Sequence, residues 1–119
     1  MGAERTRNEL LPGTLDMLVL KTLTHGHLHG YAIAQVLFQI SGDVLQVEEG
    51  SLYPALQRLL KAKMVKAEWT VSPTTSRRIR IYEITHSGLR HLEREISAFD
   101  RMLEGIQMVL GPERRTANS

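Results

Sequence analysis

The side chains best suited to a chemical task lie in one segment, residues 51–61, and their chemistry is that of nucleic-acid recognition. Gln57 can hydrogen bond to the edge of adenine, and Arg58 can contact guanine or a phosphate. Pro54 lacks an N–H and is expected in the first turn of a helix here. The candidate DNA-contacting residues of this segment are Ser51, Tyr53, Pro54, Gln57, Arg58 and Lys61. Taken alone, the same pattern also describes an ordinary surface helix with a solvated face.

A cluster of arginines forms a second candidate contact. Arg77, Arg78 and Arg80 lie at or just after a polar turn, and no acidic residue occurs between Glu68 and Glu83. A flexible basic tip of this kind can follow DNA phosphates or enter a minor groove. The alternative is a charge cluster that only keeps the surface soluble.

Other chemistries find little support. His25, His27 and His29 alternate, but they span a helix end and a glycine turn without cysteine or carboxylate ligands nearby, so we predict no metal site. Glu48 and Glu49 are adjacent and diverge on any regular element, so they do not form a catalytic pair. The chain has no cysteine. We therefore expect no catalytic residue and no cofactor, and a protein that is not an enzyme.

Apolar residues at helical spacing predict three helices in the first half of the chain, at about 14–25, 30–41 and 50–62. Thr14 is expected to cap the first helix. Two glycines within residues 25–30 predict a break between the first helix and the second.

A β-hairpin is predicted after the third helix. Residues 65–71 alternate apolar and polar side chains, and residues 77–85 return as a second strand after a turn rich in serine and threonine. The arginine cluster then lies at the hairpin tip. We expect Trp69 and Tyr82 to pack against the helical core.

A long helix is predicted at residues 86–110, capped by Thr85 or Ser87. Its apolar residues recur in alternating steps of three and four, which is an a/d heptad seam. The seam consists of Leu89, Leu92, Ile96, Phe99, Leu103, Ile106 and Leu110. Because a strict a/d stripe is narrower than the usual face of a core helix, we expect these residues to form a dimer contact. The alternative is a helix that packs back onto its own domain.

Charge and hydropathy limit the partners. The net charge of +2 is too small to indicate nucleic acid by itself, so the position of the charges must decide. No apolar run approaches the roughly 18 residues of a membrane span, and the polar N-terminus has no signal-peptide core. We expect a cytoplasmic protein without a membrane partner. The expected parts are a flexible arm at 1–9, a winged helix-turn-helix DNA-binding domain at 10–85, a dimerisation helix at 86–110 and a flexible tail at 111–119.

The order of these elements carries more information than any one of them. Three helices, the third with a polar face, followed by a basic hairpin predict a mainly α fold with a small β-hairpin. This is a winged helix-turn-helix with a C-terminal dimerisation helix. Such a unit suits duplex DNA, and a dimer would place two recognition helices one turn apart, roughly 34 Å. The alternative is a winged-helix module that docks a protein partner without specific DNA binding.

The chain also contains four short motifs: LLPGTLD at 10–16, HGYAI at 29–33, GSLYPAL at 50–56 and RIYEIT at 80–85. Their combination resembles the PadR family of bacterial transcriptional regulators. The resemblance implies a winged helix-turn-helix homodimer joined through C-terminal helices, usually a repressor. The short C-terminal part is similar to the small subgroup with a single C-terminal helix.

In that family the pattern implies that the third helix enters the major groove and the wing touches the backbone or the minor groove. Ser51, Tyr53 and Pro54 would then lie at the DNA-facing start of the helix, with Arg77 and Arg78 in the wing. We therefore expect a repressor that binds an inverted-repeat operator in double-stranded DNA as a homodimer. The family pattern leaves room for a small-molecule effector of unknown identity.

The chain departs from the family pattern after the third helix. Lys63 stands where a glycine is common, so the usual left-handed cap residue is missing. We expect either that Lys63 takes up the left-handed conformation at some energetic cost or that the helix ends differently.

Overall fold

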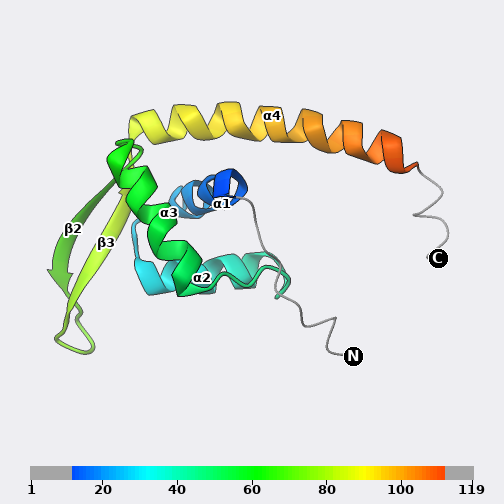
Figure 1. The fold of residues 1–119 in the computed structure, drawn as a ribbon. Helices are drawn as coiled ribbons and strands as arrows, with labels where there is room; N and C mark the ends of the chain where they lie inside the picture. The colour runs from blue at the N-terminus through cyan, green and yellow to red at the C-terminus, as the bar shows by residue number, and fades with distance from the viewer. Residues whose placement is uncertain (1–11, 112–119) are drawn as a thin grey trace.

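The computed structural model describes residues 12–111, which form a small helical domain, a three-stranded sheet and one long helix (Figure 1). The elements are α1 (Pro12–Leu23), β1 (Leu28–His29), α2 (Gly30–Ile40), α3 (Glu49–Lys61), β2 (Val65–Val71), β3 (Arg78–Ile84) and α4 (His86–Leu110). The flexible arm expected at 1–9 lies outside the described residues, as does the tail expected at 111–119 except for Gly111, which ends α4. The winged-helix architecture expected from the order of elements is confirmed.

Helix α1 forms the centre of the core. Val19 and Leu20 are fully buried, and α1 contacts α2, α3, α4 and β3. The helix begins at Pro12, so the expected cap at Thr14 is wrong, because Thr14 is the third residue of the helix. Proline suits the first helical position, since its ring presets the backbone angle and the missing N–H would be unpaired there in any case.

The break expected at 25–30 contains a short strand that the sequence did not reveal. Leu28 pairs antiparallel with Tyr82, and His29 pairs with Ile81. The expected two-stranded hairpin is therefore part of a three-stranded sheet with the order β1-β3-β2. Two residues are too short to show an alternating pattern, so only the pairing with β3 makes them a strand.

The end of α3 uses Lys63 in the left-handed conformation, with φ 61°. The Lys63 N–H donates to the Leu60 carbonyl and the Met64 N–H donates to the Leu59 carbonyl, both at 3.0 Å. These two bonds form a Schellman motif, which satisfies carbonyls that the helix end would leave unpaired. Of the two expected outcomes, the structure shows the first, in which Lys63 itself takes up the left-handed conformation.

The start of α3 differs from expectation at Pro54. The helix begins at Glu49, so Pro54 lies in the second turn and not in the first. Proline has no N–H to donate to the Gly50 carbonyl, and this turn therefore lacks one helical hydrogen bond. Both Gly50 and Pro54 are exposed, so water can hydrate the carbonyl in place of the lost donor.

One face of the hairpin packs against the helices only along part of its length. Val65 and Tyr82 are buried at the base of the sheet, at 2% and 4% exposure. Trp69, two residues further along β2 than Ala67, is 56% exposed. The expectation of core packing is therefore confirmed for Tyr82 and wrong for Trp69. The helices end before the hairpin does, so its outer half projects from the domain (Figure 1).

Helix α4 is anchored at its start by Thr85. The Thr85 hydroxyl accepts a hydrogen bond from the Gly88 N–H at 3.0 Å, which confirms the expected cap, and donates to the Lys63 carbonyl at 2.8 Å. Gly88 packs directly on the backbone of the α3–β2 connection, where an added Cβ would collide with the Met64 carbonyl. The first turn of α4 is therefore held against the end of α3.

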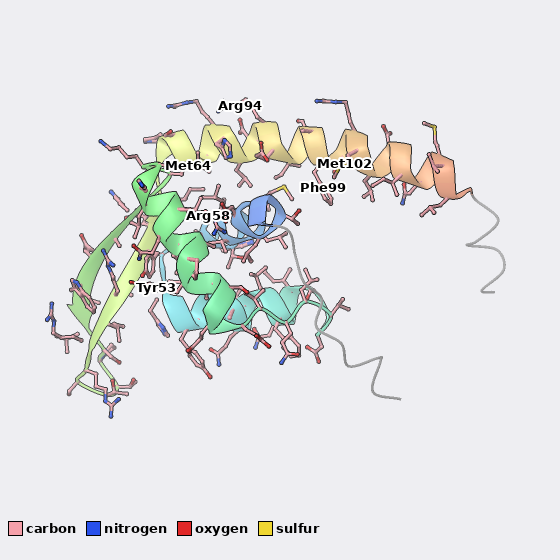
Figure 2. All side chains as sticks on the ribbon, viewed as in Figure 1. Tyr53, Arg58, Met64, Arg94, Phe99 and Met102 are labelled. Carbon is pink, nitrogen blue, oxygen red and sulfur yellow. The ribbon has the colours of Figure 1, made fainter. Side chains whose placement is uncertain are left out.

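The seam of α4 divides into two halves. Leu92 is buried in the core, and Ile96 and Phe99 pack against that core half-buried. Figure 2 shows Phe99 directed toward α1, whereas Arg94 points away from the domain. Beyond Phe99 the helix extends past α1, and Leu103, Ile106 and Leu110 are exposed at 40%, 45% and 53%. Among residues 12–111, no helix is long and apolar enough to cross a membrane.

Two glycines of α4 allow a direct test of the anchoring contact. Gly88→Ala should lower the free energy of unfolding by about 1–3 kcal/mol, because the new methyl group meets backbone that cannot move aside. Gly105→Ala, where nothing lies within 4 Å, should raise it by up to about 1 kcal/mol, because alanine restricts the unfolded chain. Urea unfolding of both variants measures the difference. Equal stability of Gly88→Ala and the parent protein would contradict the contact.

Candidate nucleic-acid interface

The polar residues of α3 lie opposite a buried apolar stripe. Leu52, Ala55, Leu56 and Leu59 are buried against the core. Of the six candidate residues expected on this helix, five are exposed and Gln57 is half-buried; the exposed residues are Ser51, Tyr53, Pro54, Arg58 and Lys61. The structure thus brings the expected residues of α3 to the surface of one element.

Gln57 differs from its neighbours because its amide is covered. The Nε2 atom is buried and has no hydrogen-bond partner within the described residues. An unpaired buried donor is unfavourable, so this amide has a hydrogen bond to gain when an acceptor approaches. Because Nε2 is covered, the Gln57 side chain has to turn outward before its amide can meet a base edge, and this was not visible in the sequence.

Arg58 is held by a carboxylate of another helix. Its Nη2 donates to Asp16 Oδ1 at 2.7 Å and its Nε donates to Asp16 Oδ2 at 3.2 Å, a two-point contact between α3 and α1. This hydrogen bonding, opposed by some desolvation and aided by the Asp16 charge, raises the pKa of Arg58. The stability that charged Arg58 adds to the fold is fully present below the ordinary pKa of arginine. It is lost only as pH rises through the raised pKa of Arg58.

The arginines of the wing have a different environment. Arg77 and Arg78 are exposed and Arg80 is half-buried, and the Arg78 and Arg80 guanidinium groups lie over the ring of Trp69. Arg77 follows Ser76, whose positive φ of 61° turns the chain back at the hairpin tip. The three expected wing residues are thus together at the outer half of the hairpin.

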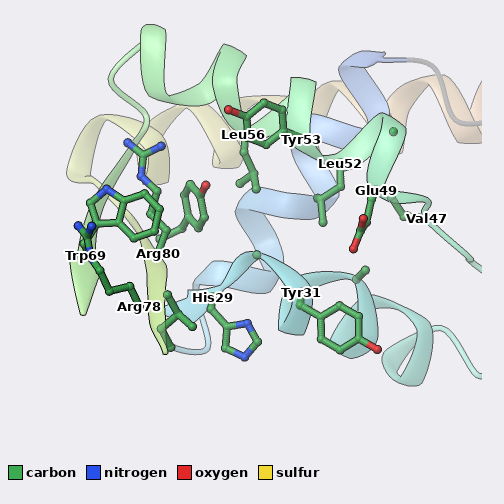
Figure 3. A pocket seen from close by; sticks show the side chains of 15 residues that line it. His29, Tyr31, Val47, Glu49, Leu52, Tyr53, Leu56, Trp69, Arg78 and Arg80 are labelled. Carbon is green, nitrogen blue, oxygen red and sulfur yellow. The ribbon is translucent and has the colours of Figure 1, made fainter. Parts of the chain in front are cut away.

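A groove of about 730 Å³ separates α3 from the wing (Figure 3). Tyr53 and Leu56 of α3 form one side, and Trp69, Arg78 and Arg80 form the other. The N-terminal end of α2 closes the groove with further lining residues, among them His29, Gly30 and Tyr31, and no residue of α4 lines it. Helix α3 and the wing therefore face a common concave surface, and the candidate contacts that line it are Tyr53, Arg78 and Arg80.

Several residues of this surface were missed by sequence reasoning. Tyr31 is 62% exposed at the start of α2, and its ring stacks with that of His29 at 6.4 Å. Trp69 was expected in the core, although its position between polar residues and near three arginines was a usable signal. Among residues 12–111, no three His, Cys, Asp or Glu side chains lie close enough together to hold a metal ion.

A family model described as the transcriptional regulator PadR-like family matches residues 19–94. The chain belongs to this family. It is a PadR-like transcriptional regulator and not an enzyme, since the proteins of this family are regulators.

The regulator resembles two proteins that have no described activity. An uncharacterized 37.1 kDa protein in transposon TN4556 of Streptomyces fradiae is 40% identical over 88 residues, covering 73% of this chain and 23% of that protein. Uncharacterized protein X of Lysinibacillus sphaericus is 25% identical over 104 residues, covering 87% of this chain and 94% of that protein. The chain thus spans most of one relative and a small part of the other.

Solved structures support the fold. A PadR family transcriptional regulator from Eggerthella lenta aligns with a TM-score of 0.72 at 29% identity, over 84% of each chain. Bacillus subtilis PadR in complex with operator DNA aligns with a TM-score of 0.61 at 24% identity, over 69% of this chain and 46% of that chain. At that identity the likeness to Bacillus subtilis PadR shows the shared fold.

The Asp16–Arg58 contact can be compared with a weaker ion pair in the same domain. Asp16→Asn should lower the free energy of unfolding by about 1 kcal/mol, near the upper limit for a partly exposed pair, because the contact has two hydrogen bonds. Glu83→Gln breaks the Lys66–Glu83 pair, whose nitrogen–oxygen distance is 3.7 Å and whose side chains are well exposed. This variant should lower the free energy of unfolding by only about 0.2 kcal/mol. Thermal unfolding at low salt measures which variant loses more stability. An equal loss of stability in Asp16→Asn and Glu83→Gln would contradict the prediction.

Proposed function

We propose that this regulator is a repressor that binds an inverted-repeat operator as a homodimer, with α3 in the major groove and the wing on the backbone or in the minor groove. The observation that carries the proposal is the shared concave surface of α3 and the wing, with candidate DNA contacts on both sides. Bacillus subtilis PadR, which has the same fold, was solved in complex with operator DNA, and that complex supports the same use of the fold here.

The residues of α3 would divide the work of recognition. Gln57 would read a base edge once its side chain turns outward from its covered position, and Ser51 and Tyr53 would position the helix on the backbone. Arg58 uses two N–H groups on Asp16, which leaves three of its five donors for a phosphate. We therefore assign Arg58 to the backbone in preference to a guanine base. Pro54 and Lys61 complete the outer face of the helix.

The wing would supply contacts that do not depend on sequence. Arg77, Arg78 and Arg80 carry three positive charges on the outer half of the hairpin. Charges of this kind bind phosphates and release counterions, so affinity should fall steeply as salt rises. Base preference would come from α3, and much of the affinity would come from the wing.

The exposed half of the α4 seam would form the dimer. Leu103, Ile106 and Leu110 continue the line of Leu92, Ile96 and Phe99, but no element within residues 12–111 covers them. An apolar stripe left in water at this spacing suits a second copy of the same helix. Leu89, the first residue of the seam, is 37% exposed and could contribute at the other end. The buried middle of the seam would remain an intramolecular contact.

Selection of protein-bound genomic fragments at physiological salt, with the molecular mass measured in solution, tests the proposal. We expect enrichment of an inverted repeat by a dimer. Transcription from the enriched promoter should rise when the protein is removed, and a fall would contradict repression. Weak binding without sequence preference, or a monomer, would replace the proposal with a protein-interaction module.

The dimer contact predicts a difference between two exposed apolar residues of α4. Ile106→Asp should produce a monomer and weaken operator binding by roughly a hundredfold or more, because a monomer loses the second binding site. Met108→Asp, which changes a residue that is 77% exposed and off the seam, should remain a dimer. Light scattering and binding assays measure both effects. A dimeric Ile106→Asp variant would contradict the seam.

A further inference from the structure

The groove side of the wing continues the core side of the sheet. In the β2–β3 register Ala67 lies opposite Tyr82, and Trp69 lies opposite Arg80. Directly opposed residues share a face, and so do residues two apart along a strand. Trp69 and Arg80 therefore lie on the same face as the buried Tyr82, at the level where the helices no longer cover the sheet.

The Trp69 ring carries two guanidinium groups. The Cζ atom of Arg78 lies 4.8 Å from the ring centroid and that of Arg80 lies 5.7 Å from it, both within the roughly 6 Å of a cation–π contact. Arg80 also lies over the Tyr82 ring at 5.8 Å. Neither arginine forms an ion pair with a carboxylate of residues 12–111. Both charges are thus oriented by rings and not neutralised by acids.

This orientation matters for a contact with an anion. A free arginine side chain loses rotamer freedom when it binds, and stacking on a ring removes part of that freedom beforehand. The ring touches the flat side of the guanidinium group, so it uses none of the N–H groups at the edge. The Nε of Arg80 is buried without a hydrogen-bond partner among residues 12–111, so its two terminal nitrogens are the donors left for a phosphate. Core packing does not account for Trp69, because more than half of its surface is in water.

We propose that Trp69 is a positioning residue of the DNA interface. Its ring holds Arg78 and Arg80 on the groove side of the wing, so that the two guanidinium groups bind the phosphates of one DNA strand as a preordered pair (Figure 3). The inference rests on the proposed DNA-binding function and adds a residue to it. Because phosphates are common to all sequences, Trp69 would govern affinity and leave base preference unchanged.

Two substitutions distinguish the effect of the aromatic ring of Trp69 from the effect of its apolar volume. Trp69→Phe keeps an aromatic face, whereas Trp69→Leu keeps an apolar side chain without one. With a mixed-sequence duplex of about 30 base pairs, long enough for two half-sites, Trp69→Leu should weaken binding about fivefold to tenfold, because both arginine side chains would then have to be ordered on binding. Trp69→Phe should weaken it less than about threefold. Equal losses in the two variants would overturn the inference.

A double-mutant cycle tests whether Trp69 acts through the arginines. In an Arg78→Gln, Arg80→Gln background, measured at low salt where binding is stronger, Trp69→Leu should have no further effect. A full additional loss would mean that the indole touches DNA directly and would overturn the positioning role. The chain has one tryptophan, so the indole N–H signal reports independently whether the ring environment changes on binding.

Thr70→Ala serves as the matched control. Thr70 neighbours Trp69 on β2 and is exposed, but it lies on the other face of the sheet, opposite Ile79 and away from Arg78 and Arg80. Binding by this variant should equal that of the parent protein, and a loss as large as that of Trp69→Leu would overturn the inference. A parent protein that binds no duplex would instead overturn the proposed function, so the two failures are distinct.

Discussion

Burial of α1 is the constraint on which the rest of the structure depends. Its apolar residues contact three helices and the sheet at once, and Val19, Leu20 and Leu23 are almost completely removed from water. Every other element of the domain takes its position from the side of α1 that it covers. The polar face of α3 points outward because Leu52, Ala55, Leu56 and Leu59 are the residues that meet this core.

The two surfaces proposed to bind DNA and a second copy of the chain are the parts of two elements that extend beyond this core. The strands β2 and β3 have seven residues each, and their outer halves project beyond the helices. Helix α4 has 25 residues, and α1, against which it packs, has 12. A core of fixed size therefore leaves a basic wing at one end and an apolar helix at the other. The first suits a polyanion and the second suits a copy of itself.

The arginines of the interface are ordered by two different means. Arg58 is fixed by the Asp16 carboxylate, which offsets its charge, whereas Arg78 and Arg80 are fixed by the Trp69 ring, which leaves their charge intact. The proposed roles differ accordingly: Arg58 would fix the angle between α3 and α1 and offer its remaining donors to one phosphate, whereas the uncompensated pair would attract phosphates by its charge.

Periodicity in the sequence determined the long elements. Strand β2 at Val65–Val71 and helix α4 at His86–Leu110 agree with expectation at both ends, because alternation and the heptad seam are properties of the local chain. The Thr85 cap could be recognised for the same reason. These features also established the winged-helix order and, with four motifs, the PadR family.

Only the tertiary structure decided which of these residues meet. Strand β1 exists through its pairing with β3, and Asp16 acquires its role from a helix 42 residues further along the chain. Trp69 and Tyr82 share one sheet face, but the length of the neighbouring helices decides that only Tyr82 is buried. The length of α1 likewise decides where the apolar seam of α4 stops packing against its own domain and becomes exposed. Such outcomes depend on where a neighbour ends, and local sequence does not encode that distance.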